Sequence, residues 1–291
     1  MKRIIYSLYI DLPEEELDFF DKNIVKEGQP SRNMFAKEQF KKNYIKIKGL
    51  QQLYAKQNKC DYILFEDDNK FKIFKDEFKL KYPYLTSYNI VNFYKIYLLY
   101  DLSKNYDEIL YLDFDVVPIN HDNFFEHNDL TKGIYVLNNN ERVSKLEDIG
   151  ENTQTIRSPN SKYYNAQAML FDKGLNTTND VINTGIIGIN KEHLIKLNYF
   201  RDFDNNLNIM TKLKTDYDMF PSKIVKYFGY DNETLFSVKI KENNVPVKWL
   251  EKKEVCFDTF ISLPATSPLR SKNDINQCIA TLDNKTDIVV G

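Results

Sequence analysis

The chain has 291 residues, of which 42% are hydrophobic and 28% charged, and its formal net charge is -2. This balance argues against a disordered chain and provides no field that would attract nucleic acid or an anionic membrane. Three scattered cysteines, no signal peptide and no long apolar run favour a reduced, cytoplasmic protein without a membrane span.

Predicted strands and helices alternate over the first part of the chain. Apolar runs predict strands at 3–10, 61–66 and 109–118, and apolar residues at helical spacing predict helices at 34–58 and 87–102. Ser87 is the expected N-cap of the second helix. The Lys-rich run 70–81 alternates basic and apolar residues and is interpreted as a solvated face.

The second part of the chain is less regular. It contains predicted strands at 133–138 and 182–190, a helix at 191–200 and a helical region at 214–229. Residues 141–180 are polar and predict a long excursion over the sheet. Short strand-like pieces, LFSVKI and PVKWLEK, predict a smaller irregular or antiparallel lobe within 231–291. We therefore expect an α/β fold with a mostly parallel central sheet flanked by helices, in a single domain spanning 1–291.

Two carboxylates interrupt the apolar run ILYLDFDVVPIN. Asp113 and Asp115 stand at the end of a predicted core strand, where open α/β sheets bind their ligands. Residues i and i+2 of an extended chain point to the same side, so both carboxylates could converge on one partner. Two such oxygen donors repel each other unless a proton or cation lies between them, and Mn²⁺ or Mg²⁺ suits them. The alternative is a structural pair that caps the following segment.

A D-x-D string alone has little specificity, because about two are expected by chance in a chain of this length. This chain also contains Asp202/Asp204 and Asp216/Asp218. The first of these lies in a polar helical stretch and is interpreted as a solvated face. Only Asp113/Asp115 follows an apolar strand and precedes a Val-Val-Pro exit.

The stretch YDEILYLDFDVVPIN resembles the metal-binding D-x-D strand of GT-A glycosyltransferases, especially glycosyltransferase family 8 and its viral and bacterial relatives. Three further segments resemble that family in the same order: FYKIYLLYDL, INTGIIGIN and KTDYDMF. The resemblance implies a GT-A, Rossmann-like fold. Its nucleotide-sugar part would be 1–140, and its acceptor-side and C-terminal part would be 141–291.

This resemblance implies a metal-dependent enzyme of glycan biosynthesis that transfers a sugar from a nucleotide-sugar donor, such as a UDP-sugar. The acceptor would be a saccharide or another hydroxyl compound. Asp113 and Asp115 would hold Mn²⁺ or Mg²⁺ against the diphosphate, and Asn183, Asp216 and Asp218 would act beside the transferred sugar. The expected nucleotide-sugar contacts are Tyr6, Ser7, Tyr9, Asp68, Lys95, Asp113, Phe114, Asp115 and Gly185.

Several of these residues have a purely structural alternative. Tyr6 and Tyr9 could be core residues, and Asp68 could cap a turn. Lys95 could be an exposed helical lysine, and Asn183 could satisfy a turn. The pair Asp216 and Asp218 could favour a helix N-terminus through the macrodipole. Asn165 and Gln167, in the apolar frame YYNAQAML, are additional acceptor-side candidates.

Two departures from the family pattern concern the chemistry. The family's third metal ligand is a histidine near the C-terminus, whereas this chain has only His121, His127 and His193, none suitably placed. In addition, Tyr217 stands where the family carries the middle Gln of its Asp-Gln-Asp segment, which leaves retention or inversion of the sugar's configuration open.

Two other functions compete with the transferase. LDFDVVPI partly matches the motif of haloacid-dehalogenase-type phosphatases, with Asp113 as nucleophile and Asp115 as acid/base. That motif normally opens its domain, whereas more than 100 residues precede it here. The second competitor is a non-catalytic module that binds nucleotide sugars.

Overall fold

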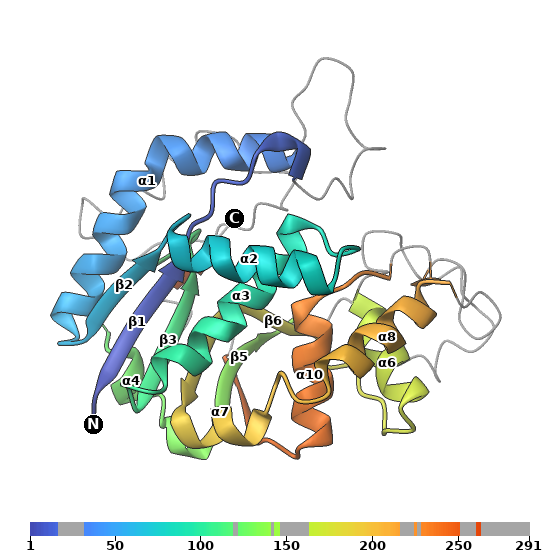
Figure 1. Ribbon diagram of the computed structural model, residues 1–291. Coiled ribbons are helices and arrows are strands. Elements are labelled where there is room, and N and C mark those ends of the chain that lie inside the picture. The colour runs from blue at the N-terminus through green and yellow to red at the C-terminus, as the bar shows by residue number, and fades with distance from the viewer. Residues whose placement is uncertain are drawn as a thin grey trace.

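A six-stranded sheet forms the centre of the protein, in a computed structural model that describes residues 1–16, 32–118, 122–140, 143–145, 163–215, 224–225, 228–250 and 260–262. The strand order is β2-β1-β3-β6-β5-β7 (Figure 1). The strands are β1 (Arg3–Leu8), β2 (Asp61–Phe65), β3 (Glu108–Asp113), β5 (Ile134–Asn138), β6 (Ile182–Asn190) and β7 (Val247–Leu250). A separate two-stranded sheet pairs β4 (Val116–Pro118) with β8 (Phe260–Ser262).

All strands of the central sheet except β6 run in one direction. β1 pairs in parallel with β2 and β3, and β5 pairs in parallel with β7. β6 is antiparallel to both of its neighbours, β3 and β5. The prediction of a mixed α/β fold with a mostly parallel sheet is therefore confirmed.

Helices cover both faces of this sheet. One face packs against α1 (Arg32–Gln57) and α4 (Phe124–His127), near the short 3-10 helix η2 (Leu130–Lys132). The other face packs against a larger group of helices: α2 (Asn69–Lys81), α3 (Ser87–Leu102), α6 (Asn165–Asp172), α7 (Lys191–Leu197), α8 (Phe203–Leu213) and α10 (Asn232–Glu242). A further 3-10 turn, η1 (Glu14–Glu16), follows β1.

Alternation along the strands divides the core between these two faces. On β3, Tyr111 packs with the α3 side, whereas Leu110 and Leu112 pack with the α1 side. Tyr6 and Ile5 of β1 divide in the same way. Strands buried on both faces therefore appear as continuous apolar runs in the sequence, which explains why they were readily predicted.

The predicted strand 109–118 is the main correction to the secondary structure. It divides into β3 and β4, which belong to different sheets, with a turn at Phe114 and Asp115 between them. The assumption that Asp113 and Asp115 share one face of an extended strand is wrong for this reason. Gln51 donates to the carbonyl oxygens of Asp113 (3.3 Å) and Val116 (2.8 Å), which holds both sides of the turn against α1.

The run 70–81 is helix α2; Lys72, Lys79 and Lys81 are exposed, as a solvated face requires, whereas Phe71 and Phe74 are buried. Three other predictions need correction. Part of the expected excursion 141–180 is helix α6. The strand-like piece LFSVKI lies within helix α10, which is buried around most of its circumference and so lacks the one-sided pattern of a surface helix. Finally, the N-cap of α3 is Thr86 rather than Ser87.

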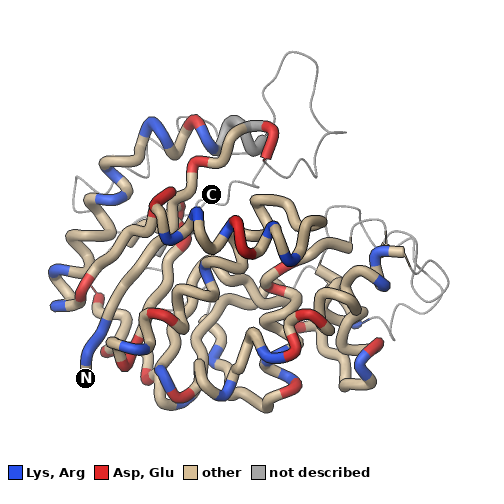
Figure 2. The backbone as a smooth tube through the Cα atoms, in the orientation of Figure 1, with Lys and Arg blue, Asp and Glu red and all other residues tan. Residues whose placement is uncertain are grey.

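The charged residues are dispersed over the molecule. Figure 2 shows mainly basic residues along α1, whereas basic and acidic residues are interspersed on the other outer helices. Within the part of the chain that the structure describes, no helix is long and apolar enough to cross a membrane. The single-domain prediction stays a prediction, although β7, from the C-terminal part, completes the central sheet.

Candidate functional site

Asp113 occupies the last position of β3, opposite Leu8 at the end of β1. The carboxyl ends of the parallel strands β1, β2 and β3 meet at this edge, which is the edge where open α/β sheets bind ligands. The Asp113 side chain is 37% exposed, so one part of the carboxylate faces solvent and another part faces protein. Asp115, in the adjoining turn, is half-buried.

Two donors hold one oxygen of the Asp113 carboxylate. The Tyr111 hydroxyl donates to Oδ1 over 2.5 Å, and the Lys95 ammonium lies 3.3 Å from the same atom. Burial first, and then the Asp113 charge, raises the pKa of Tyr111 well above its ordinary value, so this phenol stays protonated and donates. Because both contacts go to Oδ1, Oδ2 is the oxygen that the described contacts leave for a ligand.

Lys95 is a buried lysine, only 4% exposed, in the middle of α3. Its ammonium also donates to the Thr184 carbonyl over 3.3 Å and lies 5.0 Å from the centre of the Tyr111 ring. A buried cation requires such partners, because removing it from water costs several kcal/mol. The alternative that Lys95 is an exposed helical lysine is therefore wrong. The Tyr6 hydroxyl, from β1, donates to the backbone carbonyl oxygen of Lys95 over 2.7 Å.

The strand β6 bulges beside Asp113. Val136 of β5 pairs with Ile187, but the next residue, Leu137, pairs with Asn183, so β6 has extra residues between these two pairs. Bulges of this kind re-aim side chains and are common next to functional sites. This one turns the Thr184 carbonyl toward Lys95 and brings Gly185 to the Asp113 carboxylate.

Gly185 of β6 lies close to the Asp113 carboxylate at the end of β3. A Cβ atom at this position would lie 3.1 Å from Asp113 Oδ2 and 2.9 Å from Asn183 Oδ1. The Gly185 amide also donates to Asn183 Oδ1 over 2.9 Å. The structure therefore brings Asn183, Gly185, Asp113 and Lys95 together, although they are up to 90 residues apart in sequence.

Glu233 joins this group and was missed by the sequence analysis. It lies in the first turn of α10, and its Oε1 accepts from the Thr184 amide (2.8 Å) and from the Thr184 hydroxyl (3.2 Å). Asn232 donates to the same hydroxyl over 3.0 Å. The only local signal was the helix start at Asp231, whose side chain accepts from the Glu233 and Thr234 amides. That signal predicts a helix but not a contact with β6.

An aromatic cluster lies next to the turn after β3. The ring of Tyr9 lies 4.7 Å from that of Phe114 and 5.2 Å from that of Tyr44, which projects from α1. Burial first, then Asp11, Tyr44 and Glu66, raises the pKa of Tyr9 to about 12. The Tyr44 hydroxyl donates to Glu66 over 2.7 Å, just beyond the end of β2. Tilted, closely packed rings and a carboxylate thus flank the ends of β1 and β2.

Other predicted residues have mainly structural positions. Tyr6 and Ser7 are both fully buried on β1. Asp68 is the N-cap of α2 and accepts from the Phe71 amide over 2.9 Å, as its structural alternative expected. Asn165 and Gln167 are buried on α6, where Gln167 donates to the Ser144 carbonyl over 2.8 Å.

The remaining acidic pairs differ in position. Asp216 and Asp218, with Tyr217 between them, lie outside the described residues. Asp202 and Asp204 are exposed at the start of α8, where Asp204 pairs with Lys81 over 2.8 Å. The interpretation of this pair as a solvated face is confirmed.

A divalent cation fits the chemistry of this site only in part. The carboxylates of Asp113 and Asp115 are the hard oxygen ligands that Mg²⁺ and Mn²⁺ prefer. Among the residues that the structure describes, however, no group of three or more His, Cys, Asp or Glu side chains could hold a metal ion. His193 cannot supply a third ligand, because it follows Asn190, which pairs with Glu108 at the opposite end of β3.

Comparison with known proteins adds little to this geometry. No protein-family model matches the chain, and no curated protein matches its sequence. Among solved structures, it is similar to a crystal structure of a glycosyltransferase involved in the glycosylation of the major capsid of PBCV-1. The match covers 97% of this chain and 100% of that chain, at 11% sequence identity and a TM-score of 0.43. A likeness of this strength does not assign the chain to a family.

Proposed function

We propose that this protein is a metal-dependent glycosyltransferase that uses a nucleotide-sugar donor, with a UDP-sugar as the first candidate. The main support is the contact set around Asp113. A buried lysine, a half-exposed carboxylate and a bulged strand meet at the ligand-binding edge of an α/β sheet. The lysine, the carboxylate and the bulge lie in α3, β3 and β6. Three of the four sequence segments that resemble glycosyltransferase family 8 correspond to these elements.

The arrangement suits a diphosphate leaving group. Asp113 and Asp115 would hold Mn²⁺ or Mg²⁺, which when bound would stabilise the negative charge that develops on the diphosphate. Lys95 holds Oδ1 of Asp113 and so leaves Oδ2 for that role. The close approach of Gly185 keeps the space above Oδ2 free of a side chain.

The aromatic cluster suits the base of the nucleotide. Tyr9 presents partly accessible ring surface next to the strand ends and packs on the buried ring of Phe114, and Glu66 beside Tyr44 provides a hydrogen-bond acceptor. Stacking of a base on an aromatic ring contributes about 1–3 kcal/mol. Asp68 would contribute only through an oxygen that its helix-capping role leaves available.

In the proposed reaction, the acceptor oxygen forms a bond to the anomeric carbon of the donor sugar. The bond between that carbon and the diphosphate oxygen breaks, and its electron pair leaves with the nucleoside diphosphate. The acceptor's hydroxyl proton passes to a carboxylate or leaves with the diphosphate. Asp216 and Asp218 remain the predicted candidates beside the sugar, and Asn183 would orient it through hydrogen bonds.

The first test is calorimetric titration of UDP and GDP, with and without Mn²⁺, into the wild type and Asp115→Asn. We expect one nucleotide to bind only with Mn²⁺, and Asp115→Asn to weaken binding by at least about tenfold. The matched control is Asp202→Asn, because it removes one carboxylate charge from another D-x-D string at an exposed helix start. This control should bind nucleotide like the wild type.

Failure of both nucleotides to bind under any metal would contradict the transferase proposal. Covalent trapping of a beryllofluoride adduct at Asp113 would instead favour the phosphatase. Nucleotide binding without hydrolysis or transfer of any donor sugar would favour the non-catalytic module.

A further inference from the structure

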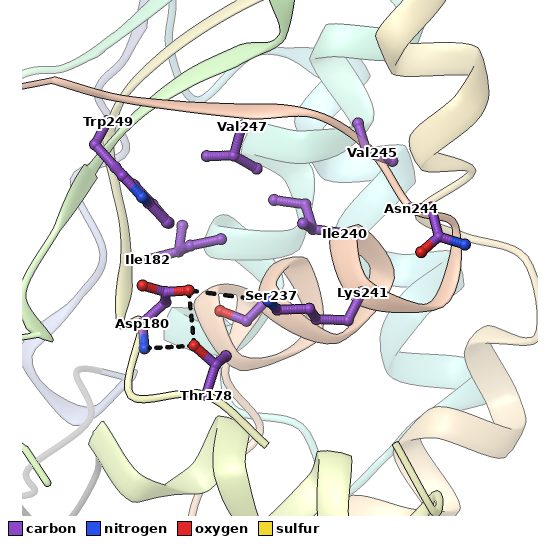
Figure 3. A pocket seen from close by; sticks show the side chains of 10 residues that line it. All are labelled: Thr178, Asp180, Ile182, Ser237, Ile240, Lys241, Asn244, Val245, Val247 and Trp249. Atoms are coloured by element: carbon purple, nitrogen blue, oxygen red, sulfur yellow. Dashed lines mark hydrogen bonds and ion pairs between the residues drawn. The ribbon is translucent and has the colours of Figure 1, made fainter. Parts of the chain in front are cut away.

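A separate pocket lies between α10, β7 and the start of β6. Its volume is about 420 Å³, within the range typical of small-molecule sites. Its lining residues come from the loop before β6, from α10 and from the edge strand β7 (Figure 3). None of the residues around Asp113 lines it.

The walls of this pocket have two different characters. Trp249, Val247 and Ile182 form an apolar side, and Trp249 is 36% exposed. Asp180, Ser237 and Lys241 face them as a polar side (Figure 3). A sugar ring matches such walls because its C–H faces are apolar and its edge carries hydroxyl groups that both donate and accept.

The charges in the pocket are balanced and held in place. The Lys241 ammonium lies 3.9 Å from the Asp180 carboxylate, and these are the two charged residues among those that line the pocket. Asp180 also accepts from the Thr178 hydroxyl (2.7 Å) and from the Asn138 amide (2.9 Å). With no surplus positive charge, the pocket does not suit a phosphate and favours a neutral ligand with many hydroxyl groups.

The pocket shares two elements with the candidate site. Ile182, in the pocket, is three residues from Gly185 along β6, a distance of no more than about 10 Å. Ser237, also in the pocket, lies one helical turn after Glu233 on α10. Asn232 and Glu233 of α10 hydrogen-bond Thr184 of β6 between the pocket and Gly185, so a glycan anchored in the pocket would have to be at least two sugar units long to extend past this contact toward Asp113.

We propose that this pocket binds a neutral saccharide and anchors the acceptor glycan with Trp249 as its stacking platform. The role of the bound saccharide as an acceptor rests on the proposed glycosyltransferase function. Saccharide binding itself can be measured without nucleotide or metal. It narrows the acceptor from any hydroxyl compound to a neutral glycan at least two sugar units long.

Trp249 is the only tryptophan in the chain, so its fluorescence reports directly on this pocket. The probes are lactose, maltotriose, cellotriose, mannotriose and di-N-acetylchitobiose, titrated without nucleotide or metal. We expect at least one to shift the emission, with a dissociation constant near the millimolar range. Lys241→Ala should weaken that saccharide severalfold, and Trp249→Ala, followed by calorimetry, should weaken it by at least about tenfold.

The matched control is Lys248→Ala, which removes an exposed lysine from β7 between the pocket residues Val247 and Trp249. It should bind the saccharide like the wild type. Lys241 is itself exposed, so Lys241→Ala is expected to fold. If Trp249→Ala does not fold, Lys241→Ala still tests the pocket.

Nucleotide titration of the same preparation separates the two proposals. If a nucleotide binds with Mn²⁺ but none of the saccharides shifts the emission, the pocket proposal is overturned and the transferase proposal survives. If a saccharide binds equally well to Lys241→Ala and Trp249→Ala, the pocket proposal is likewise overturned. If a saccharide binds through Trp249 but no nucleotide binds, the saccharide site stands and the transferase proposal fails.

Discussion

Lys95 and Asp113 depend on each other at the residue scale. Burying the ammonium costs several kcal/mol, which its contacts with a carboxylate, a carbonyl oxygen and an aromatic face offset. Asp113 in turn has one oxygen held rigidly while the other is left toward Gly185. A rigid carboxylate with one available oxygen is a better ligand than a mobile one, because less freedom is lost on binding.

Substitution of Gly185 tests this geometry. In Gly185→Ala, the new methyl group would press on Asn183 Oδ1 and Asp113 Oδ2. Under the proposed function, we expect calorimetry to show about tenfold weaker metal-dependent nucleotide binding. Because the displaced atoms are side-chain ends, the free energy of unfolding should fall by less than about 1 kcal/mol.

The control for this substitution is Gly229→Ala, since a Cβ there meets nothing within 4 Å. It should leave nucleotide binding unchanged. Unaltered nucleotide affinity in Gly185→Ala would mean that the ligand does not use the space beside Asp113 Oδ2.

At the scale of elements, β6 is hydrogen-bonded to two strands and also has a small residue, Gly188, where helix α4 packs against it. Gly188 pairs with Leu110 of β3 and Tyr135 of β5. The buried ring of Phe124, from α4, lies against it, and a Cβ at Gly188 would be only 2.6 Å from that ring. The packing of α4 on the sheet therefore requires a glycine at this position.

The variant Gly188→Ala is expected to lower the free energy of unfolding by about 1–3 kcal/mol, because the ring must move within a packed core. Urea unfolding measures this change. The same substitution at Gly49, exposed within α1 and with nothing within 4 Å of its Cβ, should raise stability by up to about 1 kcal/mol. Equal effects at the two positions would contradict the close packing of Phe124.

At the scale of the whole molecule, ion pairs join separate helices. Although burial raises the pKa of Glu242, hydrogen bonds from Lys173 and Lys239 outweigh it and hold that pKa below its usual value. Lys173 follows α6, so these contacts tie α6 to α10. Similarly, burial of Asp101 is outweighed by Lys70 and Lys104, so its pKa is also lowered, and the Lys70 contact ties α2 to α3.

These lowered pKa values make the protein sensitive to acid. A carboxyl group with a lower pKa when folded stabilises the fold fully above its unfolded pKa, about 4, and loses that contribution as the pH falls through the folded value. We therefore expect the free energy of unfolding, from urea titrations, to decrease below about pH 4.5.

Glu242→Gln isolates one of these contributions. It should cost about 1–3 kcal/mol at neutral pH, and its difference from the wild type should shrink in acid. Glu77→Gln, on the exposed side of α2, is the control and should leave stability within about 0.5 kcal/mol. A constant difference between Glu242→Gln and the wild type at every pH would contradict the role of its charge.

The sequence by itself determined most of the periodic structure. The apolar runs of β1, β2 and β6, the start of β3 and the helical spacing of α1 and α3 were predicted to within a few residues, because period and burial are local properties of the pattern. The resemblance to glycosyltransferase family 8 predicted a common donor site for Asp113, Lys95 and Gly185; the structure brings these three residues together, and their role stays a prediction. Helix α10 and the division of β3 from β4 were not predicted, since all-round burial removes the helical period and a two-residue turn leaves the apolar pattern almost unchanged.

Only the tertiary structure decided which side chains meet. Glu233 contacts Thr184 across 49 residues, and Lys95 contacts Thr184 across 89, and neither pairing has a local signal. The antiparallel direction of β6, its bulge beside Asp113 and the pocket beside Trp249 also arise from strand pairing between distant segments. Strand pairing depends on the packing of the whole core, whereas each segment's pattern records only its own burial.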